Sequence, residues 1–203
     1  MCESCLESIT RVSEALACPV CGSPDSYKDC EVCWEQQIHF DLCRAVFRFD
    51  GAIKDLIHEL KYNGLLSPVK WLAEQAVEHI RASGHFDDID LVIPVPLHKV
   101  RIRERGFNPS ALIAKVMADM LMLEYQEPVK RRIYTKSQTR LSKEERMKNL
   151  HTAFALKPEV ELSGRTVLLV DDVFTTGSTI NEVSRILRKA KPDRIKVLAI
   201  SRA

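Results

Sequence analysis

Residues 165–180 constrain the fold more than any other part of the chain. Residues 167–170, Val-Leu-Leu-Val, form an unbroken apolar run rich in β-branched side chains. Such a run predicts a strand buried on both faces of a parallel sheet. The acids Asp171 and Asp172 stand where this strand is expected to end, and a helical pattern covers residues 180–190. A strand that leads through a short loop into a helix is typical of α/β folds, so we expect a parallel sheet flanked by helices.

The loop between this strand and its helix is suited to a phosphate ester. Its residues 175–179, Thr-Thr-Gly-Ser-Thr, are small and rich in hydroxyl groups. At the start of a helix, such a loop presents backbone N–H groups and the positive end of the helix dipole. Gly177 permits a close approach to a ligand or a positive φ, while Asp171 and Asp172 suit hydroxyl groups or Mg²⁺ beside the phosphate. The segment predicts a sugar-phosphate site. The alternative is an ordinary strand–loop–helix connection in which the two acids only cap the turn.

Residues 167–179 together resemble the phosphoribosyl-pyrophosphate (PRPP) signature of the type I phosphoribosyltransferases, and no Walker or dinucleotide-binding motif accompanies them. The resemblance implies that Asp171 and Asp172 hold the ribose hydroxyls as the catalytic acids, with Mg²⁺ between these hydroxyls and the pyrophosphate. It also implies that the ligand's 5-phosphate lies on the loop. The implied substrate-binding residues of this signature are Val173, Phe174, Thr175, Thr176, Gly177, Ser178 and Thr179.

Six of the seven cysteines form three Cys-x-x-Cys pairs: Cys2 with Cys5, Cys18 with Cys21, and Cys30 with Cys33. Without an export signal, this spacing predicts zinc ligands rather than disulfides. Two pairs complete a tetrahedral site, and the metal would hold together a head too small to bury much core. The second and third pairs are separated by 8 residues and the first and second by 12, so either combination is feasible. We expect a zinc-binding head over residues 1–43 and a main domain over residues 44–203.

Composition and charge indicate the class of protein and its location in the cell. With 45% hydrophobic and 29% charged residues, the chain is expected to be globular. It has no apolar run near the roughly 20 residues that span a bilayer, and its first residues lack the pattern of a secretory signal. We therefore expect a cytoplasmic protein, with peripheral attachment to the inner face of the membrane as an option. The net charge is only +2, yet residues 97–148 carry 13 Lys/Arg against 6 Asp/Glu.

Three other segments are candidates for the same site. Residues 89–96 predict a strand, and the basic residues after it would lie at the carboxyl edge of the sheet, where ligands bind. Among these, Arg103 and the catalytic candidate Arg105 offer guanidinium groups that match phosphate oxygens. Lys61 stands at the end of a helix predicted over residues 51–62 and is able to reach a pyrophosphate; a merely exposed helix end is the alternative. The polar segment 135–149 predicts a lid or a partner-binding loop.

The combination of these motifs resembles the ComF (ComFC) family over essentially the whole chain. The shared features are the cysteine pairs, Pro-Val-Pro-Leu, Arg-Gly-Phe-Asn, the motif Thr-x-x-Gln-x-x-Leu and the PRPP loop. The resemblance implies a zinc-binding head joined to a type I phosphoribosyltransferase domain, with a role in DNA uptake during natural competence. It also adds Gln138 to the implied substrate-binding residues. Family chains commonly have four cysteine pairs and a Gln at the position of Pro109, and this chain departs from both patterns.

Two other classes of function compete with a transferase. One is a single-stranded DNA-binding module that uses the fold without catalysis; the basic segment 97–148 favours it, and Phe107 would stack a base. The other is an adaptor whose head docks a protein of the DNA-uptake machinery. Binding of PRPP with Mg²⁺ would separate the transferase from the adaptor, and a steep salt dependence of DNA affinity would favour the first rival. The residues identify no acceptor nucleophile.

Overall fold

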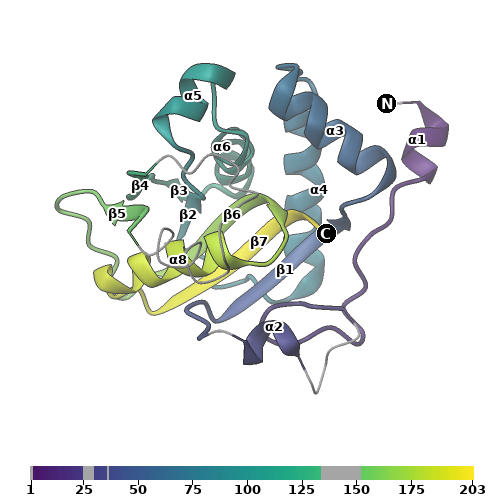
Figure 1. The fold of residues 1–203 in the computed structure, drawn as a ribbon. Coiled ribbons are helices and arrows are strands. Elements are labelled where there is room, and N and C mark those ends of the chain that lie inside the picture. The colour runs from purple at the N-terminus through teal and green to yellow at the C-terminus, as the bar shows by residue number, and fades with distance from the viewer. Residues whose placement is uncertain (1, 25–29, 36, 134–151) are drawn as a thin grey trace.

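The computed structural model describes residues 2–24, 30–35, 37–133 and 152–203. In this part of the chain, five parallel strands form one sheet in the order β1-β7-β6-β2-β3. Their bounds are Leu42–Arg48 for β1, Leu91–Pro94 for β2, Glu124–Tyr125 for β3, Thr166–Phe174 for β6 and Arg194–Arg202 for β7. Helices cover both faces of the sheet (Figure 1), so the expected fold class, a parallel sheet flanked by helices, is confirmed.

The central strand β6 is buried as its apolar run predicts, but it is longer than expected. Residues 167–170 are fully buried, each with 0% of its surface exposed. The strand does not end at the acids: pairing with β7 continues through Asp171 and Val173 to Phe174, which lies opposite Arg202. The pairing persists because β7 is equally long and runs alongside it. Asp171 and Asp172 therefore lie within β6, and the pairing of this strand with β7 holds their backbone in place.

One face of the sheet is covered by three helices. These are α3 over Gly51–Tyr62, α4 over Pro68–Ser83 and α6 over Pro109–Leu121, and their apolar residues share one core with the sheet. In α3 the buried residues Ile53, Ile57 and Leu60 recur at the helical spacing that predicts it. Both α4 and α6 begin at a proline, because the first helical position needs no backbone donor.

The opposite face has a mixed cover. It consists of α8 over Ser178–Leu187, the 3₁₀ turn η1 over Arg188–Ala190 and an antiparallel pair formed by β4, Val129–Arg131, and β5, Phe154–Leu156. Buried cysteines of the N-terminal head complete this core. The head contributes the short helices α1, Glu3–Glu7, and α2, Glu31–Trp34. The expected division at residues 43 and 44 falls inside β1, since Cys43 already pairs with Val197 of β7.

The order of the strands creates a switch point in the sheet. The chain leaves β2 toward β3 on one side, whereas it leaves β6 toward β7 on the other side, and β2 and β6 are neighbours. In open α/β sheets, ligands bind outside the carboxyl ends of strands at such a point. Among the described residues, no helix has the length and apolar character that crossing a bilayer requires.

Candidate functional site

A cavity of about 200 Å³ lies at the switch point of the sheet. The carboxyl end of β6 contributes Asp171 and Asp172, and the segment after β2 contributes Val95, Pro96 and Leu97. Helices complete its wall. The remaining lining residues are Lys61 and Tyr62 from α3, Arg105 from α5 (Lys99–Arg105), Asn108, Pro109 and Ser110 at the start of α6, Arg131 from β4 and Thr179 from α8. The cavity thus combines two carboxylates, three cationic side chains and the first turn of a helix.

The two acids are held by different partners. Asp171 Oδ1 accepts a hydrogen bond from Ser110 Oγ at 3.0 Å and another from the backbone N–H of Asp172 at 2.9 Å. The carboxylate of Asp172 pairs with Lys61 Nζ at 2.6 Å. Both side chains of this ion pair are largely buried, with 20% and 12% of their surfaces exposed. A cation or a set of hydroxyl groups that binds Asp172 must therefore share this carboxylate with Lys61.

The environment of Asp171 favours its protonated form. Burial, followed by the nearby Asp172 carboxylate, raises the pKa of Asp171 from 3.8 to about 7, although Lys61 acts in the opposite direction. A carboxyl group with such a pKa changes its charge near neutral pH. Strongly perturbed acids in a cleft are typical of functional sites.

The loop after β6 has the geometry that its composition predicts. Gly177 is the N-cap of α8 and has φ of 73°, a left-handed conformation that side chains other than glycine rarely adopt. A methyl group at this position would also lie 2.5 Å from Cζ of Phe174. The hydroxyl groups of Thr176 and Ser178 are 2.9 Å apart, and Thr175 and Thr176 are exposed. The first N–H groups of α8 follow directly, where helices lack internal acceptors.

Val173 and Phe174 support the loop from inside the protein. Val173 packs against the core beneath α3, α4 and α6, whereas Phe174 is 1% exposed and lies in the core on the opposite face. Their side chains alternate between the two faces, as expected for a strand.

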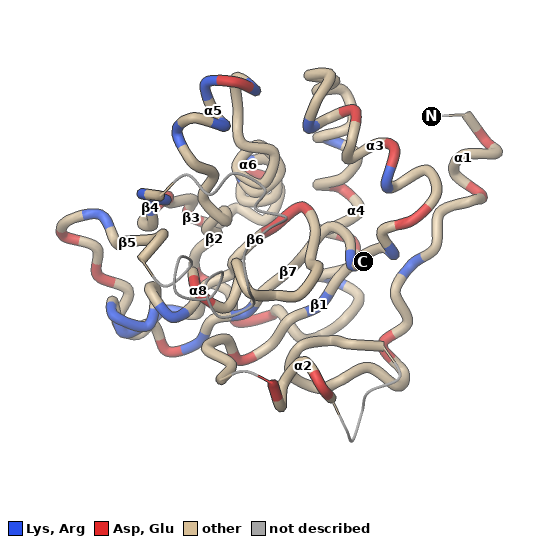
Figure 2. The backbone as a smooth tube through the Cα atoms, viewed as in Figure 1, with Lys and Arg blue, Asp and Glu red and all other residues tan. Residues whose placement is uncertain are grey.

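The basic candidates separate into two groups. Lys61 and Arg105 line the cavity, and the Arg105 guanidinium lies 5.2 Å from the centre of the Tyr62 ring. Arg103 lies on the same helix, α5 over Lys99–Arg105, but it is exposed and is not among the described residues that line the cavity. Figure 2 shows the basic residues of α5 above the sheet. Gln138 lies outside the described residues.

Sequence reasoning gave no individual role to several residues of this cavity, among them Asn108, Ser110 and Arg131. Asn108 donates through Nδ2 to the Val95 carbonyl at 2.9 Å and thereby joins α6 to the segment after β2. Ser110 binds Asp171, as described above, and Arg131 lies over the Phe154 ring at 5.3 Å while it faces the cavity. The signal available for Asn108 is its place directly before a helix-starting proline. No local pattern identifies Ser110 or Arg131, since each reaches the site only through the tertiary fold.

Comparisons with known proteins agree with this geometry. A model of the phosphoribosyl transferase domain matches residues 104–202. Competence protein F of Haemophilus influenzae is 32% identical over 193 residues, which cover 92% of this chain and 84% of that protein. The chain belongs to the competence protein F (ComF) family. Two other relatives cover all of this chain: the DNA utilization protein YhgH of Escherichia coli at 31% identity and competence protein ComFC of Bacillus subtilis at 27%. They are matched over 90% and 84% of their own lengths.

In this ComF chain the fold brings two of the three Cys-x-x-Cys pairs together and leaves the third pair apart. The sulfur atoms of Cys18, Cys21, Cys30 and Cys33 all lie within 4.8 Å of one another. The Sγ atoms of Cys18 and Cys33 are 3.7 Å apart and those of Cys21 and Cys30 are 3.3 Å apart. Tetrahedral zinc–sulfur bonds of about 2.3 Å separate the sulfurs by roughly 3.8 Å, so this cluster fits a metal of that kind. Cys2 and Cys5, with their sulfurs 3.2 Å apart, do not belong to the cluster.

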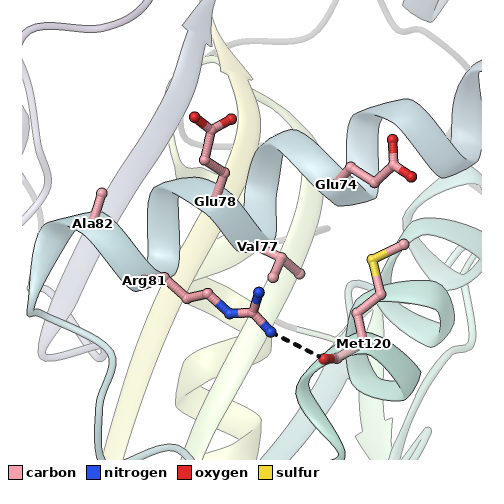
Figure 3. A pocket seen from close by; sticks show the side chains of 6 residues that line it. All are labelled: Glu74, Val77, Glu78, Arg81, Ala82 and Met120. Atoms are coloured by element: carbon pink, nitrogen blue, oxygen red, sulfur yellow. Dashed lines mark hydrogen bonds between the residues drawn. The ribbon is translucent and has the colours of Figure 1, made fainter.

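A larger hollow of about 640 Å³ lies between α4 and α6 in this ComF chain. Figure 3 shows its lining: Glu74, Val77, Glu78, Arg81, Ala82 and Met120, with Arg81 donating to the Met120 carbonyl at 3.3 Å. The two glutamates make this surface poorly suited to a phosphate. The cavity at the switch point, which is lined by three cationic side chains and by Thr179 of the hydroxyl-rich loop, is therefore the better candidate.

Proposed function

We propose that this chain is a PRPP-binding, phosphoribosyltransferase-like protein with a zinc-binding head, and that it acts in DNA uptake. The observation that carries the proposal is that Asp171, Asp172 and Thr179, the last residue of the loop 175–179, line one cavity at the switch point of the sheet. The role in DNA uptake is supported by the printed names of its relatives, which are competence and DNA utilization proteins.

In this proposal the 5-phosphate and the pyrophosphate of PRPP bind to different parts of the site. The loop 175–179 and the first N–H groups of α8 bind the 5-phosphate, because they combine hydroxyl groups with the positive end of a helix dipole. Asp171 and Asp172 face the ribose hydroxyls. Lys61, Arg105 and Arg131 line the same cavity and bind the pyrophosphate. Displacement at C1 of the ribose creates a cationic sugar, so the site must exclude water and hold anions more than it must supply a strong base.

Two metals complete the proposal. Asp171 and Asp172 are the residues that would hold Mg²⁺, since hard divalent cations prefer carboxylate and phosphate oxygens. When bound, Mg²⁺ neutralises charge on the pyrophosphate leaving group. The cluster of Cys18, Cys21, Cys30 and Cys33 would hold a structural zinc ion with no open position for substrate. Cysteine pairs that serve as metal ligands suit a reducing compartment, so we place the protein in the cytoplasm.

Calorimetric titration with PRPP, with and without Mg²⁺, tests the proposal. The wild-type chain is expected to bind one PRPP in the presence of Mg²⁺. The double substitution Asp171→Asn with Asp172→Asn is expected to weaken binding by at least about tenfold, equal to roughly 1.4 kcal/mol. The matched control replaces Asp55 and Asp87, two exposed acids outside the cavity, by Asn and is expected to bind like the wild type. Absence of binding to the wild type, or equal binding to both double variants, would refute the proposal.

Single-stranded DNA is the second ligand that we propose to test. The observation in its favour is the row of basic residues on α5, where Arg103 is exposed beside the cavity. Neutralising phosphates releases counterions, so direct binding must weaken steeply as salt increases. Fluorescence anisotropy of a labelled oligonucleotide at several salt concentrations measures this slope. Affinity that is absent even at low salt would exclude direct DNA binding and leave DNA uptake to partner proteins.

A further inference from the structure

Arg202 near the end of β7 connects the cysteine cluster with the candidate phosphate loop. It is only 8% exposed, which is unusual for a charged side chain. Its Nη1 donates a hydrogen bond of 2.7 Å to the backbone carbonyl of Cys21. Its guanidinium carbon also lies 4.2 Å from the centre of the Phe174 ring, a cation–π distance. One buried cation thus contacts both a cluster cysteine and the strand end that leads into the loop.

The contact with Phe174 extends to the loop itself. The Phe174 ring lies directly beneath Gly177, because a methyl group there would be 2.5 Å from its Cζ and 3.0 Å from its Cε2. The backbone is joined at the same place, since the N–H of Ala203 donates to the Phe174 carbonyl at 3.0 Å. A tilt of this ring would therefore move Gly177 and with it the first turn of α8. The Arg202 guanidinium lies over this same ring.

On the other side, the turn that holds Cys18 and Cys21 is fastened to the sheet. The N–H of Cys43 donates to the Val20 carbonyl at 2.6 Å, and a methyl group at Gly22 would lie 2.6 Å from the Cys43 carbonyl oxygen. Arg44 donates through Nη1 to the carbonyls of Cys18 and Pro19 at 3.5 and 3.3 Å. The turn cannot shift without disturbing these contacts. The turn that carries two of the candidate metal ligands therefore contacts both the sheet and, through the Cys21 carbonyl, Arg202.

We propose that Arg202 is a positioning residue that couples the metal cluster to the phosphate loop. When the metal holds the turn at residues 18–22, the Cys21 carbonyl fixes the Arg202 guanidinium, and the guanidinium fixes the ring beneath Gly177. Metal loss then loosens the loop, and by thermodynamic reciprocity an occupied loop retains the metal more tightly. The coupling of cluster and loop concerns the protein alone; only its ligand half rests on the proposed PRPP function.

Hydrogen–deuterium exchange tests the coupling without any ligand. The readout is the exchange rate of residues 175–181 in metal-loaded and chelator-treated protein. In the wild type, metal removal is expected to speed this exchange, and Arg202→Met is expected to speed it while the metal is still bound. The increase in exchange rate on metal removal should then be smaller in Arg202→Met than in the wild type. The expected difference is a factor of at least about 2, which corresponds to the low end of coupling between contacting residues. The matched control is Arg194→Met on the same strand, a residue that pairs with Asp88 and is 61% exposed.

The outcomes are distinct. The coupling is refuted if the loop of Arg202→Met exchanges at the rate found in Arg194→Met. It is also refuted if metal removal speeds loop exchange equally in these two variants. Should Arg202→Met fold poorly, Arg202→Lys serves instead: it keeps the charge and a donor for Cys21 but loses the planar group above Phe174. The lysine variant is expected to retain the metal and still exchange faster over the loop. Wild-type exchange in that variant would overturn the proposal.

A second measurement separates this inference from the proposed function. Metal release to a coloured chelator is timed with and without saturating PRPP. The wild type and Arg194→Met are expected to release metal more slowly with PRPP, and Arg202→Met is expected to lose this difference. If PRPP does not bind the wild type at all, the proposed function fails while the exchange experiment still decides the coupling. If PRPP slows release equally in all three proteins, the coupling to the ligand is refuted.

Discussion

The two faces of the sheet are covered in different ways. One face packs against α3, α4 and α6, and its core of buried side chains is made almost entirely of aliphatic and aromatic groups. The other face packs against one long helix, α8, the β4–β5 pair and the buried Cys18, Cys21 and Cys30 of the head. The first face is thus stabilised chiefly by burial of apolar surface. The second uses the cysteine cluster in the place where an α/β fold usually has a helix.

This difference assigns separate roles to the two faces. The helical face contributes stability that needs no ligand. The mixed face contains Phe174, Arg202 and the start of α8, so the candidate phosphate loop rests on the side whose cover includes the cysteine cluster. We therefore expect perturbations of the helical face to change global stability, and perturbations of the mixed face to change the site as well.

The largest expected effect follows removal of the cluster ligands. Structural zinc sites bind with free energies on the order of 10 kcal/mol, comparable with the whole stability of a domain. Cys21→Ser combined with Cys30→Ser is expected to abolish metal binding and to lower the unfolding temperature strongly. The matched control, Cys2→Ser with Cys5→Ser, lies outside the cluster and should leave both quantities unchanged. Metal analysis and scanning calorimetry measure the outcome; equal losses in both double variants would contradict the assignment of ligands.

Truncation of a buried side chain in the helical face is expected to have a smaller effect on stability and to leave the metal bound. Leu72 of α4 is fully buried, and Leu→Ala substitutions in such positions cost about 2–5 kcal/mol. Leu72→Ala should lower the free energy of unfolding by that amount while the metal content stays at the wild-type level. Denaturant titration and metal analysis check both statements. Loss of metal in this variant would show that the two faces are not separate.

A substitution in the loop is expected to affect binding more than stability. Gly177→Ala places a methyl group against the Phe174 ring in a backbone conformation with φ of 73°. Strain of this kind costs about 1–3 kcal/mol. We expect a modest decrease in stability together with loss of PRPP affinity, because the ring or the loop must move. Calorimetric titration of the folded variant measures this; wild-type affinity would show that the loop geometry is not needed for binding.

The last expected effect is a dependence of stability on pH. Burial and the Asp172 carboxylate raise the pKa of Asp171 to about 7, so the metal-free folded protein holds a proton that the unfolded chain has released above its ordinary value of 3.8. Stability from this group is therefore fully present at low pH and is lost as the pH rises toward 7. Asp171→Asn imitates the protonated form, so its stability relative to the wild type should increase between pH 5 and pH 8. A difference that does not change with pH would contradict the raised pKa.

The elements that sequence predicts well are those with a local pattern. The apolar spacing of α3 and the Asn63-Gly64 stop predict its bounds, Gly51–Tyr62, as the structure has them. The helix α5 was missed because its residues Lys99–Arg105 have no buried side. Its signals are the His98 cap, whose Nδ1 accepts from the Val100 N–H at 3.2 Å, and Gly106 with φ of 87° at its end. Caps of this kind are weaker signals than hydrophobic spacing.

The candidate site shows the same limit. The loop 175–179 and its two acids are contiguous, so composition alone predicts a phosphate site there. Arg131 and Ser110 come from elements far along the chain and enter the cavity only through strand order and helix packing. The contact between Arg202 and the Cys21 carbonyl joins residues 181 positions apart. Contacts of this range have no local pattern, and they form only when the sheet has assembled.

The most direct test of the central claim is a map of backbone amide signals in the nuclear magnetic resonance spectrum of labelled, metal-loaded protein during titration with PRPP and Mg²⁺. We predict saturable shifts at the amides of Thr176, Gly177, Ser178 and Thr179, with the neighbouring Asp172 affected at the same ligand concentration. Shifts confined to other surfaces, such as the hollow between α4 and α6, would show that the hydroxyl-rich loop is not the phosphate site.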